Sequence, residues 1–224
     1  MNYEKHFEIS CEKRNSFWKE IGSLETDVLS HMINPSFIGG PTWPSLRQAF
    51  VKIDTSNSTI IATDGLSDPY SDYDTNKENQ GYNGLGFELY LESEKLEDLD
   101  TVKNSWQFDV LYQASLLAAD NGNLINMFQK YTYLSTELYA KKVPEQFVNE
   151  EGRVGVLMGL QSNVVPSKVT LSIEPVMLIN VKLITPAEIK YITDNGASGR
   201  NEIAEKIMKE ENSTLSTLER KFVL

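Results

Sequence analysis

The chain has 224 residues, of which 40% are hydrophobic and 10% aromatic, a composition typical of a globular protein and not of a disordered one. Its 32 acidic residues outnumber 21 basic ones, and the resulting net charge of -11 argues against binding to the phosphate backbone of a nucleic acid. No apolar run approaches the roughly 20 residues that span a bilayer, and the charged N-terminus lacks the apolar core of a secretory signal, so we expect a cytoplasmic protein without a membrane segment.

The N-terminal part predicts helix first and then a hairpin. Apolar residues near helical spacing in the first thirty positions indicate one or two amphipathic helices, while Pro and Gly crowd residues 34–45 and predict an irregular segment. Residues 47–53 alternate as a strand does, residues 54–58 are typical of a turn, and residues 59–65 form the returning strand.

A polar loop at 67–83 and a strong strand follow. In the strand, residues 84–93, the apolar side chains alternate with polar ones. One predicted face carries Phe87, Leu89 and Leu91, and the other carries Glu88, Tyr90 and Glu92.

The second half combines a clear helix with strands. Residues 105–122 predict the best helix of the chain, with Ser105 as its cap, and residues 124–138 are helical or mixed. Residues 153–161 and 169–184 are rich in strand formers, and Pro175 either separates two strands or marks a bulge in the second stretch.

The last predicted elements are helical. Thr185 can cap a helix that has Pro186 in its first turn and stops at Gly196, and a further helix is expected from 199 to 210. No linker divides the chain, so we predict one α/β domain over 1–224, with central mixed or antiparallel sheets flanked by helices.

Four aspartates follow the hairpin, at positions 64, 68, 72 and 74. Their spacing does not match a calcium-binding loop, and Gly65 is misplaced for one. We interpret Asp64-Gly65 as a turn in which the Asp64 carboxylate accepts backbone N–H groups and Gly65 takes a positive φ. An enzyme that uses Asp64, Asp68 and Glu88 around a metal remains a third, less favoured hypothesis.

Other catalytic and metal signatures are missing from the sequence. His6 and His31 occur in no zinc or triad motif, and Cys11 is the single cysteine, which excludes an internal disulfide and a zinc ribbon. Trp43 and Trp106 are interpreted as core residues. We therefore predict no catalytic residue, no cofactor and no bound metal.

The order of five segments resembles the suppressor of fused domain family, particularly its bacterial members. They are GGPTWPSLRQAF, IIATDGLSDPY, GLGFELYLES, SWQFDVLYQASLLA and VMLINVKLITPAEIKYITDNGA. The resemblance covers about residues 39–207, and we assign residues 1–38 to the same domain as its helical N-terminal part. It implies a mixed α/β fold without established catalysis.

The resemblance also implies a binding function. Animal members bind and restrain a transcription factor and have a further C-terminal domain, for which this chain is too short. Many bacterial members resemble immunity proteins of polymorphic toxins, including nucleases. We therefore expect a non-enzymatic immunity protein (an antitoxin) that binds a basic toxin domain; the alternative is a regulator that sequesters a cellular protein.

The expected interface combines acids with tyrosines, a composition suited to a basic protein partner. It includes the strand face Glu88-Tyr90-Glu92 if that face is open to solvent. The expected partner-binding residues are Asp68, Tyr70, Asp72, Tyr73, Asp74, Glu88, Tyr90 and Glu92.

Overall fold

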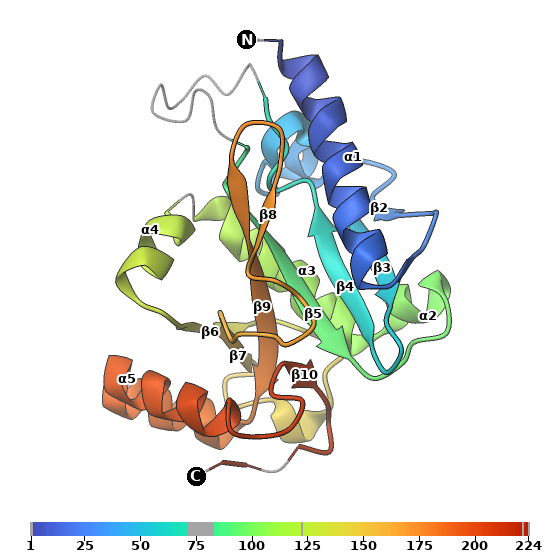
Figure 1. Cartoon of the computed structure of the whole chain (residues 1–224). Coiled ribbons are helices and arrows are strands. Elements are labelled where there is room, and N and C mark those ends of the chain that lie inside the picture. The colour runs from blue at the N-terminus through green and yellow to red at the C-terminus, as the bar shows by residue number, and fades with distance from the viewer. Residues whose placement is uncertain (1, 71–82, 122, 221, 224) are drawn as a thin grey trace.

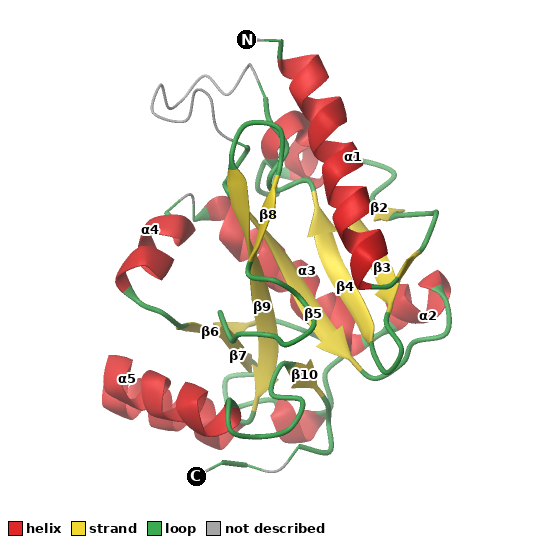
Figure 2. Cartoon of the chain, viewed as in Figure 1, coloured by secondary structure: helices red, strands yellow, loops and turns green. Residues whose placement is uncertain are grey.

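The computed structural model describes residues 2–70, 83–121, 123–220 and 222–223 (Figure 1). Within them, five α-helices surround one open, mixed sheet of ten strands, which confirms the predicted mixed α/β class (Figure 2). The α-helices are α1 (Tyr3–Ile21), α2 (Leu99–Asn104), α3 (Trp106–Asp120), α4 (Leu124–Lys130) and α5 (Pro186–Ile207). Short 3-10 helices are η1 (Pro35–Ile38), η2 (Pro44–Leu46) and η4 (Glu145–Phe147).

The sheet runs in the order β1-β3-β4-β5-β9-β7-β6, and β2, β10 and β8 pair beside β3, β5 and β9. The central pair β5–β9 and the pair β10–β5 are parallel, and the other pairs are antiparallel. The strands are β1 (Ser23–Leu24), β2 (Leu29–Ser30), β3 (Ala49–Asp54), β4 (Thr59–Asp64), β5 (Phe87–Ser93), β6 (Leu134–Leu138), β7 (Val154–Met158), β8 (Lys168–Thr170), β9 (Pro175–Ile184) and β10 (Leu215–Ser216).

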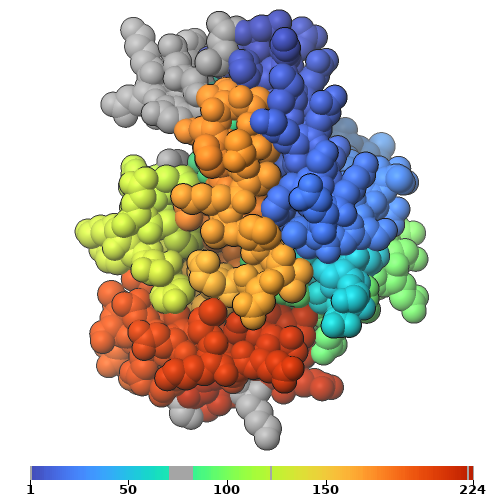
Figure 3. Space-filling model, viewed as in Figure 1, coloured from blue at the N-terminus to red at the C-terminus, as the bar shows by residue number. Residues whose placement is uncertain are grey.

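Helices cover both faces of the sheet. On one face α3 packs against Phe50, Ile61 and Leu89, and on the other α1 contributes Trp18, which lies beside Tyr90. In Figure 1, α1 and α3 lie on opposite sides of the strands. A third apolar cluster joins α5 to β7 and the end of β9. Figure 3 shows α5 and the C-terminal residues at one end of the molecule and α1 at the other.

Most elements with strong local signals form as predicted. The hairpin is β3–β4, and the predicted helix at 105–122 is α3, capped by the Ser105 hydroxyl, which accepts from the Phe108 N–H at 3.1 Å. The mixed segment at 124–138 becomes α4 followed by β6. Pro175 begins β9 and so separates two strands, which is the first of the two predicted alternatives.

The C-terminal helices also follow the prediction, with one difference. Thr185 caps α5 in a reciprocal arrangement with Glu188, and Pro186 occupies the first helical position. The helix is broken at Gly196, where φ is 60°, and the second helical stretch ends at Ile207, three residues before the predicted end. Helix α2 was not predicted, and the irregular segment 34–45 includes η1 and the start of η2.

We expect Thr185→Ala to lower the free energy of unfolding by about 1 kcal/mol, because the N–H of Glu188 loses its acceptor at the start of α5. Thermal or urea unfolding measures the change. Thr185→Ser keeps the hydroxyl and is the matched control, so an equal loss in both variants would contradict the capping role.

Candidate functional site

Arg14 of α1 lies at the centre of a buried ionic cluster. Its side chain is 0% exposed. Its Nε donates to Asp64 Oδ1 at 2.6 Å, its Nη2 to Asp68 Oδ1 at 2.6 Å and its Nη1 to Ser67 Oγ at 2.9 Å. Arg47 reaches the other oxygens of the two aspartates, at 2.7 Å and 2.9 Å. Each aspartate therefore bridges the two guanidinium groups, with one carboxylate oxygen bonded to Arg14 and the other to Arg47.

Glu88, and not Asp64, binds the backbone of the turn. Its carboxylate accepts the N–H groups of Gly65 and Ser67 at 3.1 and 2.9 Å and the Ser67 hydroxyl at 2.6 Å. The expectation that the Asp64 carboxylate accepts these N–H groups is wrong, because both of its oxygens face arginines. The positive φ predicted for Gly65 is present, at 156°.

The cluster explains the shifted pKa values of three of its side chains. Burial alone would raise the pKa of Asp64, but Arg14 and Arg47 lower it to about 2. Burial dominates at Glu88 and raises its pKa, despite the Arg14 guanidinium 3.6 Å away. Burial alone would lower the pKa of Arg14, yet the facing carboxylates raise it. The three acids of the metal-enzyme hypothesis do meet, but they meet around Arg14, and no cluster suited to a metal occurs in the part of the chain that is described.

The predicted partner-binding face of β5 is not open to solvent. Glu88 is 0% exposed, Tyr90 2% and Glu92 7%, because α1, β8 and the C-terminal residues cover this side. The Glu92 carboxylate accepts the hydroxyls of Ser58 and Thr214 at 2.7 and 2.8 Å. This face was predicted as part of the interface only if it is open to solvent, and it is buried instead.

The remaining predicted interface residues divide in two. Asp68 is fully buried in the Arg14 cluster, and Tyr70 is partly buried. Asp72, Tyr73 and Asp74 lie outside the described residues.

The other end of the sheet has an open edge at β6. In the described residues β6 pairs with β7 alone, in an antiparallel register that places Thr136 opposite Val156. Gly159, which follows β7, donates its backbone N–H to the backbone oxygen of Asn180 in β9. In an antiparallel ladder, the backbone groups of successive residues point alternately toward the two neighbouring strands. The backbone groups of the odd-numbered residues of β7 therefore point toward β9. The even-numbered residues then bond to β6. Consequently the backbone N–H and C=O groups of Ser135 and Glu137 point away from the sheet.

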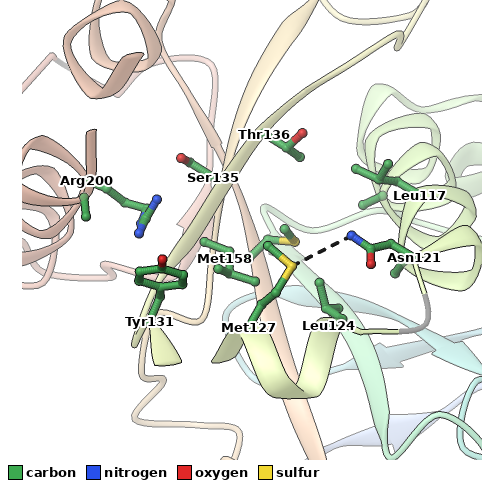
Figure 4. A pocket seen from close by; sticks show the side chains of 13 residues that line it. Leu117, Asn121, Leu124, Met127, Tyr131, Ser135, Thr136, Met158 and Arg200 are labelled. Carbon is green, nitrogen blue, oxygen red and sulfur yellow. Dashed lines mark hydrogen bonds between the residues drawn. The ribbon is translucent and has the colours of Figure 1, made fainter. Parts of the chain in front are cut away.

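A hollow borders this edge. A cavity of about 430 Å³ lies between α3, α4, β6 and α5, and a second of about 360 Å³ shares Ser135, Thr136 and Arg200 with it. In Figure 4, Thr136 lies toward Leu117 of α3 and Ser135 toward Arg200 of α5. The α3 side is lined mainly by apolar side chains (Ala114, Leu117, Ala118, Leu124, Met127, Met158).

Two arginines give the α5 side its charge. The Arg200 guanidinium lies 5.2 Å from the centre of the Tyr131 ring, and Arg153 lies 4.9 Å from that of Tyr139. The Nε atoms of both arginines are shielded from solvent and have no hydrogen-bond partner in the structure. Neither arginine has a carboxylate within ion-pair distance among the described residues.

A separate group of exposed apolar side chains lies in the segment 28–46. Met32, Ile33, Phe37 and Ile38 are among the most exposed large apolar residues that the structure describes. Such exposure is a second feature of a binding surface.

Sequence reasoning did not identify Arg14, Arg47 or the β6 edge. The helical pattern of residues 3–21 gave one hint, since Arg14 lies one turn before Trp18 on the face that packs against the sheet. No local signal marks Ser135 as an edge residue, because the position of a strand within a sheet depends on topology.

No family model and no curated protein sequence matches the chain. Solved structures do match. The chain superposes with a TM-score of 0.60 and 11% identity on a chain of the Sufu–Fu complex crystal structure, over 97% of this chain and 91% of that one. Against Drosophila Suppressor of Fused the TM-score is 0.61 and the identity 10%, over 96% of this chain and 50% of that one.

The protein therefore has a Suppressor of Fused-like fold, as the sequence resemblance implied. The chain spans half of the Drosophila structure. At these identities the likeness concerns the fold alone. In addition, none of the helices in the described part is long and apolar enough to cross a membrane.

The Asp64 carboxylate predicts a specific acid sensitivity. Its pKa is lowered in the folded state, so its contribution to stability is present above pH 4 and is lost as the pH falls towards 2. We expect Asp64→Asn to have a lower free energy of unfolding than the native chain at pH 6. This difference in free energy should narrow by roughly 2 kcal/mol between pH 5 and pH 2. Urea unfolding at each pH measures the difference; a difference independent of pH would contradict the ion pairing. Glu88 titrates in the opposite sense, and because the Asp64 carboxylate contributes to its raised pKa, the Glu88 titration differs between the two proteins and offsets part of the narrowing.

Proposed function

We propose that the protein acts by binding rather than by catalysis, as a regulator that receives an extended segment of a partner protein along the open edge of β6. The observation that carries this proposal is the outward direction of the backbone groups of Ser135 and Glu137; both residues line the cavity of about 360 Å³, and Ser135 also lines the one of about 430 Å³. An extended peptide can satisfy the free backbone groups of an edge strand while its side chains fill adjacent pockets.

The space beside β6 suits an added strand. Helices α3 and α5 lie on the two faces of the sheet at this edge, and the cavity occupies the gap between them. An eighth strand on the main path of the sheet would therefore be covered on both faces, as its neighbours are. The likeness to a chain of the Sufu–Fu complex supports a protein partner without identifying one.

The bonding of the Asp64, Asp68 and Glu88 carboxylates supports a binding role too. Asp64 and Asp68 are held by two arginines, and Glu88 is occupied by backbone N–H groups of the turn. Groups bound in this way are fixed structural elements, and an enzymatic role for them would require the cluster to open.

A second candidate function is neutralisation of a basic toxin, the immunity role that the sequence resemblance implied. The observation that favours it is the net charge of -11, which accelerates encounter with a basic protein. A toxin gene beside the gene for this chain, and rescue of growth on co-expression, would support it. A neighbouring regulator without a toxin would favour sequestration of a cellular protein.

We expect Ser135→Pro to abolish capture of the partner from cells of the source organism. Proline removes the outward N–H of Ser135 and places its ring at the edge, while the bonds of Thr136 to β7 remain. Tagged native and variant chains are compared by affinity capture and quantitative mass spectrometry, and circular dichroism checks that the variant is folded.

Phe37→Ser is the matched control for the exposed apolar group in segment 28–46, because Phe37 is 73% exposed and distant in sequence from β6. We expect it to retain the partner. Loss of the partner from Phe37→Ser, with retention by Ser135→Pro, would move the binding surface to segment 28–46 and contradict the proposal.

A further inference from the structure

We propose that the segment received by β6 alternates an apolar residue with an aspartate or glutamate, and that Arg200 binds the acidic side chain. This inference rests on the proposed function, because it specifies which partner segment the edge selects. It assigns a specificity-determining role to an arginine that has no ion-pair partner among the described residues.

The first step is the contrast between Arg200 and the other shielded arginines. Arg14 and Arg47 each contact two aspartates within 2.9 Å. The side chain of Arg200 lines the hollow, and its Nε is hidden from solvent without an acceptor. A shielded guanidinium donor without a partner is costly, and a carboxylate is the acceptor that best matches it.

The second step is the local sign of the charge. The hollow shared by α5 and β6 is lined by two arginines and by one acid, Glu137, in a chain whose net charge is -11. The Glu137 carboxylate accepts the side-chain N–H of Asn149. Lys130 adds a third positive group in this region, since its Nζ lies 5.0 Å from the centre of the Tyr131 ring that Arg200 also contacts. This hollow is therefore suited to an anionic side chain.

The third step is the alternation of side chains along a strand. Leu134, Leu138 and the even-numbered residues of β7 pack with α3, whereas Leu157 of β7 packs with α5. An added strand continues this pleat, so consecutive side chains point in turn toward α3 and toward α5. One of each neighbouring pair enters the apolar hollow and the other approaches Arg200.

Long-range and short-range electrostatics then have different effects. The acidic chain as a whole favours a partner with a positive net charge, while Arg200 favours an acid within the bound segment. A partner with a basic surface and one acidic, apolar segment satisfies both conditions.

The test selects random displayed peptides of about ten residues, a typical strand length, on the native chain and on Ser135→Pro. We expect some peptides to be enriched by the native chain and not by Ser135→Pro, and these peptides should carry an acidic residue next to an apolar one. For the best peptide, Arg200→Gln should weaken binding by about tenfold or more, as should replacing the peptide acid by its amide. The two changes together should cost little more than either alone.

Lys190→Gln is the matched control, because Lys190 lies on the same helix, loses the same charge and has a side chain that is 74% exposed. It should leave the affinity unchanged. The amide peptide tests the pairing without any change to the protein, so a folding defect in Arg200→Gln does not obscure the result.

The contradictory outcomes separate the two proposals. The role of Arg200 is overturned if the peptides that depend on Ser135 show no preference for an acid. It is also overturned if the affinity losses from Arg200→Gln and from the amide peptide simply add. Either outcome leaves the edge of β6 as the binding site. Absence of any peptide that depends on Ser135, or pairing of the chain with itself through β6 in gel filtration, overturns both.

Discussion

The buried guanidinium of Arg14 is the constraint on which much of the fold depends. A charge so shielded from water is tolerated only where carboxylates surround it, and Asp64, Asp68 and Glu88 supply them. Arg14 lies on α1, Asp64 at the end of β4, Asp68 on the turn that follows and Glu88 on β5, so satisfying one cation fixes α1, β4 with its turn and β5 relative to one another. Glu88 extends the constraint to the backbone of the turn, whose N–H groups it accepts. The result is a set of buried ionic bonds that joins the helix, the turn and the two strands at this end of the molecule.

The opposite end of the sheet is arranged differently. There β6 has backbone groups without partners in the described residues, and Arg200 has no acid. Polar groups in protein interiors are normally satisfied, and the shielded Nε atoms of Arg153 and Arg200 are exceptions that lie beside a cavity. The two ends thus use the same residue type in different ways. Arg14 is bonded within the scaffold, whereas Arg200 lines a hollow and has no ion-pair partner among the described residues.

Local chemistry made much of the fold predictable. Ser105 and Thr185 cap helices through bonds to residues three positions away, and the turn between β3 and β4 joins adjacent segments. The site was not predictable in this way. Alternation along β5 suggests one wet face, but Glu88 and Glu92 find their donors from distant segments and lie inside. The openness of β6 is a property of strand order, which no residue of β6 encodes by itself.

The placement of α1 has a consequence for synthesis. The helix leaves the ribosome before the sheet does, and the aspartates that neutralise its Arg14 follow 50 to 54 residues later and Glu88 later still. Until β5 has emerged, the nascent chain carries an amphipathic helix with no sheet to pack against. The residues of α1 must therefore remain solvated or be held by a chaperone until Ser93, the last residue of β5, has emerged, and a pause placed before β5 would lengthen that exposure.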